Sequence, residues 1–261
     1  MTPGDADEVA RRVAAVLEDA WQRLADKQEA VTAAIVARWR LPYVLATLEE
    51  FKAAISDFGS RVDREARAFV TVQLPHLYRE GADAAGEVVG ERFGWTLVHS
   101  AALQSLASDA YGDFLRRSQE AERMAEQWYR RARAAARREV PLLAAGNMTA
   151  RQAAKNLADG LAGQGLAHVV YRNGARVPVR VWAETATLTK SSVAYNTGTL
   201  NKAREAGVGV VEVFDGFDCG WTTHRDPDKA NRTLRSVEEA AEWPISHPRC
   251  RRAFGPRPDA A

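Results

Sequence analysis

Apolar residues recur every three or four positions through most of the first 140 residues, a spacing that favours helix over strand. The segment 5–39 contains neither glycine nor proline, and Pro42 follows it, so we predict one helix that ends before this proline. As a single helix it would be roughly 50 Å long, too long for a compact core to cover entirely. Its apolar positions are Val9, Val13, Val16, Leu17, Trp21, Leu24, Val31, Ile35 and Trp39.

Further segments carry the same helical spacing. The segment 47–72 repeats it and is followed by Pro75, where a helix is expected to end. From 81 to 114 the pattern continues with interspersed glycines, which weaken a helix without excluding it. The segment 115–140 completes the helical half. Residues 1–146 are therefore predicted to form a helical arm or bundle.

The sequence changes character after residue 146. Thr149 is typical of a helix N-cap. Polar and apolar residues then alternate from 168 to 182 around Asn173 and Gly174, and this dipeptide is a strong signal for a β-hairpin.

The rest of the chain predicts a small mixed region. A helix is expected over 183–207 and ends at a glycine, and a valine-rich strand follows over 208–216 before an irregular tail. The order helix, hairpin, helix, strand predicts an α+β domain over 147–261. The fold class is therefore mainly α, with long N-terminal helices and a small C-terminal α+β domain. His76, His99 and His168 stand alone in this pattern and are expected to be ordinary half-buried side chains.

The overall composition restricts function only slightly. A formal net charge of +2 neither demands nor excludes a nucleic-acid partner, so any basic surface must be local. The first residues are polar and lack the apolar core of a signal peptide, and no segment has the roughly 20 apolar residues of a membrane-spanning helix. We therefore expect a cytoplasmic protein without a membrane partner, in which two cysteines do not indicate a disulfide framework.

The segment 115–140 is strongly basic. It contains eight arginines and four glutamates. Glu–Arg pairs along a solvated helix face are one interpretation, and a basic strip that faces phosphate or an acidic protein is the other. Arginines near the C-terminus could add to such a strip. The candidate contact residues are Arg116, Arg117, Arg130, Arg131, Arg137, Arg138, Arg251 and Arg252.

Both cysteines and two of the five histidines lie between residues 218 and 252. Cys219 precedes His224 by five positions, and His247 precedes Cys250 by three. Two imidazoles and two thiolates are a ligand set that Zn²⁺ accepts in tetrahedral geometry, so a structural zinc site is one hypothesis. The spacing is unusual for a zinc knuckle, and three alternatives stay open: a packed motif, a disulfide, and a catalytic Cys–His pair.

Several segments of the second half resemble the MuF-like minor capsid proteins, or head morphogenesis proteins, of tailed bacteriophages, most closely those of phages infecting actinobacteria. The resemblance covers about residues 147–256. It rests on an Ala-Tyr-Asn-Thr-Gly core in a helix, a Gly-Val strand, an Asp/Cys turn and a closing His-Pro-Arg-Cys-Arg. These segments are 194–198, 207–213, 215–221 and 247–251, and the hairpin and helix entry over 171–184 also resembles that group. Where relatives carry a second cysteine after the closing motif, this chain has Arg252.

This resemblance implies a non-enzymatic structural protein of the virion. Such proteins are present in few copies, associate with the portal vertex inside the capsid, and assist head assembly, DNA packaging or ejection. The implied partners are the portal protein, the major capsid or scaffolding protein, packaged DNA and further copies of the chain. Two alternatives stay open: a metal-dependent hydrolase or toxin-like effector that uses the Cys/His cluster, and a DNA-binding module that uses the helix 116–138.

Overall fold

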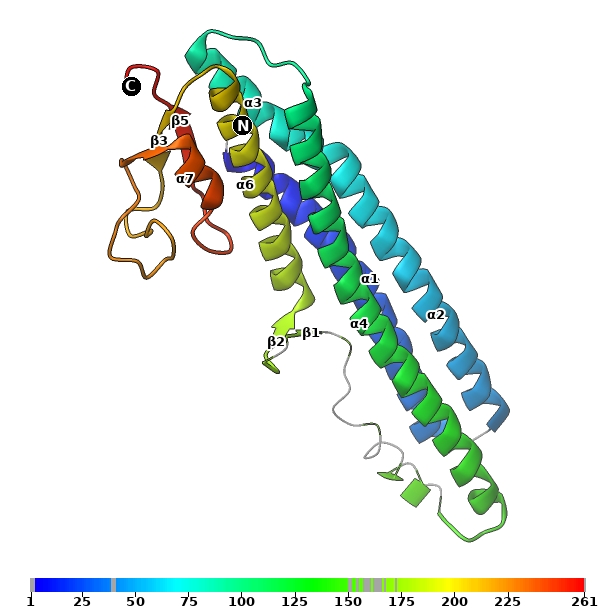
Figure 1. Cartoon of the computed structure of the whole chain (residues 1–261). Coiled ribbons are helices and arrows are strands. Elements are labelled where there is room, and N and C mark those ends of the chain that lie inside the picture. Colours follow the sequence, from blue (N-terminus) through cyan, green and yellow to red (C-terminus); the bar gives the residue numbers. More distant parts are fainter. Residues whose placement is uncertain are drawn as a thin grey trace. The chain divides into compact units, whose positions relative to one another are not determined.

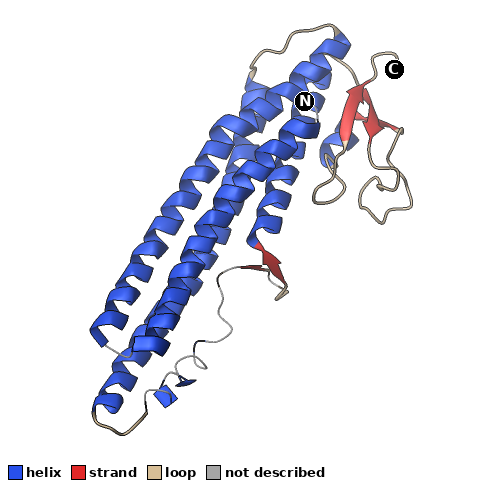
Figure 2. Cartoon of the chain, turned by 180° about the vertical axis from the view of Figure 1, so that it is seen from behind, coloured by secondary structure: helices blue, strands red, loops and turns tan. Residues whose placement is uncertain are grey.

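The computed structural model of the protein describes residues 3–38, 41–149, 152–153, 155–156, 161, 166, 168–171 and 173–260 (Figure 1). Its helical elements are α1 (Pro3–Arg38), α2 (Leu41–Ala68), the π-helix η1 (Phe69–Gln73), α3 (Leu74–Val89), α4 (Leu97–Ala144), α6 (Val179–Glu205) and α7 (Val237–Glu242). Its strands are β1 (His168–Val170), β2 (Arg176–Pro178), β3 (Val210–Phe214), β4 (Leu234–Ser236) and β5 (Ala253–Pro256). Helices make up most of the described chain and the strands are short (Figure 2), which confirms the predicted fold class.

The helix predicted before Pro42 is confirmed as α1, but Pro75 does not end a helix. The chain stays helical from Leu41 to Val89, and it passes the proline through the π-helical segment η1. Proline has no N–H to donate, and the π-helical turn shifts the hydrogen bonding just before it, so that the N–H of Leu74 donates to Phe69 O.

The helix predicted over 81–114 is interrupted. Gly90 adopts φ +76°, a left-handed conformation that glycine reaches without steric cost, and its N–H donates to Gly86 O. The N–H of Glu91 donates to the same carbonyl at 2.9 Å. Residues 91–96 are irregular, and α4 then runs without interruption through the basic segment. One of the interspersed glycines, Gly90, therefore ends a helix, and the apolar spacing alone did not predict this end.

Contacts within the chain group it into two compact units. Unit 1 comprises residues 1–14, 66–112 and 182–261, and unit 2 comprises residues 15–65 and 113–181. Both units draw residues from either side of position 146. The predicted division into domains 1–146 and 147–261 stays a prediction.

Aromatic side chains from three helices form the core of unit 2. Trp21 of α1 packs edge-on against Phe58 of α2, with 4.4 Å between ring centroids. Phe51 of α2 packs edge-on against Trp128 of α4, with 5.1 Å between centroids. Such pairs contribute about 0.5–1.5 kcal/mol each beyond the burial of their area. The apolar spacing of the sequence is thus explained by helix packing within this unit, although Val16 is exposed.

The predicted hairpin is present in unit 2. Strands β1 and β2 pair antiparallel, with Val169 opposite Val177. The turn between them is closed by the N–H of Gly174, which donates to Tyr171 O at 2.9 Å, and Gly174 has φ +79°. The side chain of Asn173 accepts from the N–H of Ala175 at 3.1 Å. The strands are three residues long because α6 begins directly after β2.

The C-terminal part of unit 1 contains more regular structure than the irregular tail predicted. Strand β3, which the sequence predicts, is the centre of an antiparallel sheet with the order β4-β3-β5. Helix α7 follows β4 and begins with a capping box, in which Ser236 accepts from the N–H of Glu239 and the Glu239 carboxylate accepts from the N–H of Ser236. The apolar residues beneath the sheet include Val211, Val213 and Trp221.

Helices α3 and α6 approach each other closely in unit 1. A Cβ atom added to Gly198 would lie 2.1 Å from Tyr78 O, and one added to Gly81 would lie 2.0 Å from Tyr195 O. The hydroxyl of Thr199 donates to Gly81 O at 3.0 Å across the same contact. Glycine is therefore needed at both positions so that the two helix backbones can touch.

Candidate metal centre

Two short turns position the cysteines in unit 1. The N–H of Cys219 donates to Gly216 O at 3.0 Å, and the N–H of Cys250 donates to His247 O at 3.0 Å. In the second turn Arg249 follows a proline and has φ +65°, which are the features of a type II turn. Each cysteine therefore closes a four-residue turn, and the second turn also carries a histidine.

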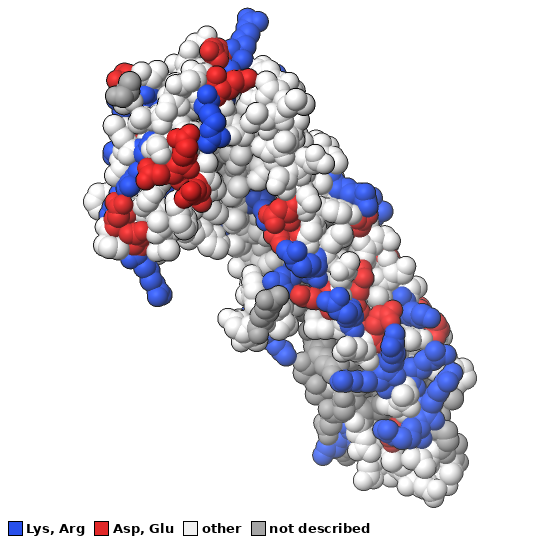
Figure 3. All heavy atoms as spheres, viewed as in Figure 1, with Lys and Arg blue, Asp and Glu red and all other residues white. Residues whose placement is uncertain are grey.

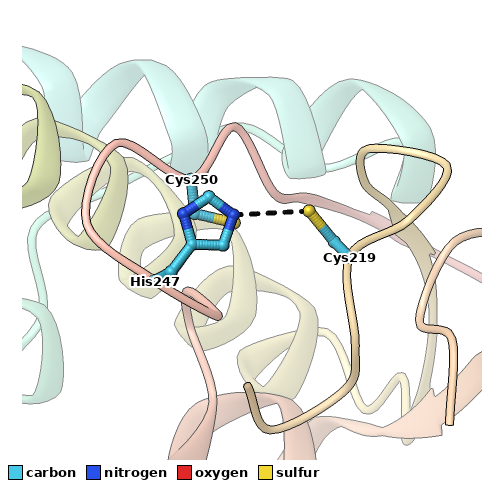
Figure 4. A group of neighbouring side chains, drawn as sticks. All are labelled: Cys219, His247 and Cys250. Atoms are coloured by element: carbon cyan, nitrogen blue, oxygen red, sulfur yellow. Dashed lines mark hydrogen bonds between the residues drawn. The ribbon is translucent and has the colours of Figure 1, made fainter. Parts of the chain in front are cut away.

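Three potential ligand atoms converge between these turns. The Sγ atoms of Cys219 and Cys250 and a ring nitrogen of His247 all lie within 4.8 Å of one another. His247 Nε2 lies 3.4 Å from Cys219 Sγ (Figure 4). Both cysteines are buried free thiols. The cluster therefore has the atom types and the spacing of a small metal centre.

A backbone carbonyl fixes the tautomer of the histidine. His247 Nδ1 lies 2.9 Å from Pro248 O. A carbonyl oxygen can only accept, so Nδ1 carries the proton and Nε2 presents its lone pair toward Cys219. Metal-ligating histidines commonly donate their second ring nitrogen in this way.

The fourth predicted ligand stands apart from this group. His224 is exposed, and its ring packs edge-on against that of His247 with 5.0 Å between centroids. It is not part of the group of three converging ligand atoms. The structure thus brings together three of the four residues that the sequence predicted, and it places His224 outside this group, against the ring of His247.

Burial, together with the nearby carboxylate of Asp215, raises the pKa of Cys219 to about 11. The thiol is therefore protonated at neutral pH, and it becomes a thiolate only if a cation displaces the proton. A nucleophilic cysteine needs the opposite shift. This environment does not favour the alternative in which Cys219 acts as a catalytic nucleophile.

The residue that replaces the second cysteine of the resembling proteins has a structural role. Arg252 forms an ion pair with Asp215, with Nε and Oδ2 2.8 Å apart and both side chains fully buried. Its remaining guanidinium donors reach the carbonyl oxygens of Gly220, Trp221 and Trp243 at 2.6–2.9 Å. Arg252 was predicted as a nucleic-acid or portal contact, but its side chain is fully buried and therefore out of reach of such a partner.

The aromatic residue after Cys219 also has a clear place. Trp221 is buried, and two guanidinium groups lie over its ring, that of Arg235 at 4.6 Å and that of Arg252 at 5.0 Å from the ring centroid. Arg235 is held by two hydrogen bonds to Asp228, at 2.9 and 3.0 Å. The bulky residue between Cys219 and His224 is therefore held by cation–π contacts inside the protein.

Asn196, in the Ala-Tyr-Asn-Thr-Gly segment, was not predicted as a site residue. Its side-chain nitrogen donates to Pro244 O and to Arg252 O, both at 2.8 Å, and the residue is fully buried. It therefore ties α6 to the segment that carries His247 and Cys250. The Ala-Tyr-Asn-Thr-Gly motif was the sequence signal for this role. Its Asn196 makes these buried hydrogen bonds, and its Gly198 allows α6 to touch α3.

A second buried polar cluster lies in unit 1. Tyr78 OH is 2.8 Å from His99 Nδ1, and His99 Nε2 is 3.3 Å from a carboxylate oxygen of Glu205. Lys202 forms ion pairs with Glu205 at 3.2 Å and with Glu91 at 2.8 Å. His99 is 1% exposed, so the expectation of a half-buried side chain is wrong for this residue. The cluster joins α3, α4, α6 and the irregular segment after Gly90.

The basic residues of α4 form a stripe in unit 2. Arg116, Arg123, Arg130 and Arg137 are all exposed and recur every seven residues, about 10.5 Å apart along the helix. Buried Ala125, Trp128 and Ala132 lie on the opposite, core-facing side. In Figure 3, basic side chains gather over the region that α4 occupies in Figure 1, with acidic ones among them. These four residues are called the arginine stripe.

The predicted contact residues differ in whether their guanidinium groups form ion pairs within the protein. Arg130 pairs with Glu126 at 3.0 Å. Arg131 and Arg137 are exposed and form no ion pair within the part of the chain that the structure describes. The remaining predicted residues all form ion pairs: Arg116 with Asp113, Arg117 with Glu120, Arg138 with Glu139 and Arg251 with Asp7.

Comparison with known families identifies the chain at the family level. No helix among the described residues is both long and apolar enough to cross a bilayer. No curated protein and no solved structure matches the chain. A family model described as phage minor capsid protein 2 matches residues 43–218, more than half of the chain, from α2 through β3 up to the residue before Cys219. The match includes helices outside the resemblance noted in the sequence. The chain belongs to the phage minor capsid protein 2 family.

Proposed function

We propose that this protein is a non-enzymatic structural component of the head of a tailed phage, located at the portal vertex inside the capsid, where it assists head assembly, DNA packaging or ejection. The observation that carries the proposal is the family match over residues 43–218. The MuF-like segments of the second half support the finer assignment to head morphogenesis proteins, and the actinobacterial host rests on that resemblance.

The arginine stripe supports contact with an acidic partner. Its members project from a face of α4 that the core of unit 2 does not use. A seven-residue repeat keeps four guanidinium groups in line over nearly six helix turns, roughly 30 Å. An acidic helix with the same repeat, or a row of phosphates, could pair with such a line. We assign the stripe to the portal protein or a neighbouring capsid component, with packaged DNA as the alternative partner.

Exposed apolar side chains offer a second contact surface in unit 1. Val88, Trp95, Leu97 and Val98 are between 48% and 89% exposed, and they cluster in sequence around the irregular segment between α3 and α4. Soluble proteins seldom leave several large apolar side chains exposed together unless a partner covers them. This surface agrees with a protein that works inside an assembly and that associates with further copies of itself or with other head proteins.

The test is co-assembly in the native system. The full chain would be produced with the portal and major capsid proteins of its phage, and purified procapsids would be analysed for copy number and for crosslinks to the portal. The proposal expects few copies per procapsid and crosslinks from α4 to the portal. Replacing the arginine stripe by glutamine should reduce incorporation, whereas replacement by lysine should preserve it. Two results would contradict the proposal: incorporation of the glutamine variant at the wild-type level, or absence of the wild-type protein from procapsids that contain the portal.

DNA binding is the second candidate, because the arginine stripe favours phosphate as well as carboxylate. Binding of the full chain to duplex DNA would be measured by fluorescence anisotropy over a range of salt concentrations. If four arginines contact phosphate, the slope of log affinity against log salt should be about −3.6, and the glutamine variant should lose that slope. If DNA binding is absent or insensitive to salt, and crosslinks to the portal are found, the partner of the arginine stripe is a protein and not DNA.

A further inference from the structure

We propose that Cys219, His247 and Cys250 bind one Zn²⁺ ion through both sulfurs and His247 Nε2, with the fourth position open to water. This centre goes beyond the proposed head function and does not depend on it. It also lies outside the residues that the family model matches, which end at Asp218.

The distances between the three ligand atoms fit a tetrahedral ion. With Zn–S of about 2.3 Å and Zn–N of about 2.05 Å, the S···N edge of a tetrahedron is about 3.6 Å and the S···S edge about 3.8 Å. Cys219 Sγ and His247 Nε2 lie 3.4 Å apart, and all three atoms lie within 4.8 Å. No pair needs to move by more than about 1.2 Å to reach these edges.

The surrounding backbone is shaped for these side chains. A Cβ atom at Gly216 would lie 3.1 Å from Cys219 Sγ, so a larger residue there would crowd the sulfur. Arg249 keeps a left-handed φ of +65°, which is costly for a residue with a side chain and persists where the surroundings enforce it. That turn is what directs His247 and Cys250 to the same point. The Pro248 carbonyl holds His247 in the tautomer that presents Nε2 to the ion.

The charges also balance. Two thiolates and a neutral imidazole bring the charge of a Zn²⁺ centre to zero. The neighbouring carboxylate of Asp215 is already paired with Arg252 inside the protein. Binding therefore adds no net charge to a buried region, and the penalty for burying an unpaired ion is avoided. Two soft thiolates with one imidazole favour Zn²⁺ over Mg²⁺ or Ca²⁺, which prefer oxygen ligands.

The ion would add a second cross-link between the two segments that Arg252 already joins through its hydrogen bonds to Gly220 O and Trp221 O. Between the end of β3 and the start of β5, the described regular structure is the three-residue strand β4 and the six-residue helix α7. A ligand on each side of this stretch closes it into a loop. Metal binding in such a region supplies folding free energy that a small apolar core cannot.

The experiment uses the full chain purified from zinc-supplemented cells. Elemental analysis should give about one zinc per chain, and Cys219→Ser and Cys250→Ser should each lose most of it. His224→Ala is the matched control, and it should keep the zinc because the ring lies outside the group of three. Loss of zinc in His224→Ala would overturn the three-residue assignment.

A second measurement covers the case in which a cysteine variant fails to fold. The wild-type chain, stripped with a chelator and titrated with Co²⁺, should develop thiolate-to-cobalt charge-transfer absorption that saturates at one equivalent and is displaced by Zn²⁺. A wild-type chain without zinc that gives no such absorption overturns the proposal. In that case two titratable thiols would indicate a packed motif, and no free thiol would indicate a disulfide between Cys219 and Cys250.

Discussion

The guanidinium of Arg252 and the carboxylate of Asp215 lie 2.8 Å apart with both side chains fully buried. The next residue toward the N-terminus, Arg251, also forms an ion pair, with Asp7 at 2.7 Å, but its side chain is 65% exposed. Two adjacent arginines therefore make the same kind of pair in opposite environments. Their comparison isolates the effect of burial.

Arg252→Met should destabilise the protein by about 3–5 kcal/mol, because it leaves the Asp215 carboxylate buried without its partner. Arg251→Met should change the free energy of unfolding by at most about 1 kcal/mol, as expected for an exposed pair. Urea unfolding followed by circular dichroism would measure both. Similar losses in the two variants would show that burial does not determine the strength of the Arg252 pair.

Gly198→Ala should destabilise unit 1, because its Cβ would lie 2.1 Å from Tyr78 O and force α3 and α6 apart. Overpacking of this kind costs about 1–3 kcal/mol, and here the obstacle is backbone rather than a flexible side chain. Gly94→Ala is the matched control, since nothing lies within 4 Å of its Cβ. Thermal unfolding should separate the two variants, and an unchanged melting temperature for Gly198→Ala would disprove the close contact.

Glu205→Gln should destabilise the protein at neutral pH and much less in acid. Burial opposes ionisation of Glu205, but hydrogen bonds from His99 and Lys202 outweigh it and lower its pKa below the ordinary 4.5. A carboxylate with a lowered pKa stabilises the folded state above its unfolded pKa, and this contribution is lost as the pH falls through the folded pKa. The difference between wild type and variant should therefore shrink below pH 4.5.

Urea unfolding at several pH values between 7 and 3 would test this dependence. Glu238→Gln is a suitable control, because that carboxylate is 70% exposed and lies 3.6 Å from Arg204. It should show little difference from wild type at any pH. A Glu205→Gln effect that does not vary with pH would mean that shape, rather than charge, is what matters at this position.

Replacing all four residues of the arginine stripe by glutamine should leave the stability within about 1 kcal/mol of wild type. Exposed ion pairs such as Arg130–Glu126 contribute little, and glutamine has nearly the same helix propensity as arginine. Circular dichroism and thermal unfolding of the glutamine and lysine variants would check this. A large loss confined to the glutamine variant would give the stripe a role in folding instead of partner binding.

Local signals predicted much of the fold. The hairpin at Asn173 and Gly174 follows from turn chemistry between neighbouring residues, and α1 follows from apolar spacing without an interruption. Strands β4 and β5 were missed because each gains its partner only through β3, with Val211 paired to both Arg235 and Pro256. Strands of three or four residues carry almost no pattern of their own.

The candidate site was predictable in its residue types but not in its arrangement. Cys219, His247 and Cys250 were singled out because these residue types are rare in the chain. The exclusion of His224 and the internal role of Arg252 depend on contacts made far along the chain. Asp215, for example, lies 37 residues from the arginine that it pairs with. From the sequence alone, an arginine that anchors a core is therefore indistinguishable from one that extends a basic surface segment.

Unit 1 is assembled from three separate stretches of sequence, and its last strand, β5, ends at Pro256. On the ribosome, residues 15–65 and 113–181 of unit 2 are complete before most of α6 has been made. Unit 2 can therefore begin to fold on the nascent chain, whereas β3 has no β5 to pair with until the ribosome has also made residues 215–256. The order of synthesis thus makes the helix with the arginine stripe available before the sheet and the Cys/His cluster.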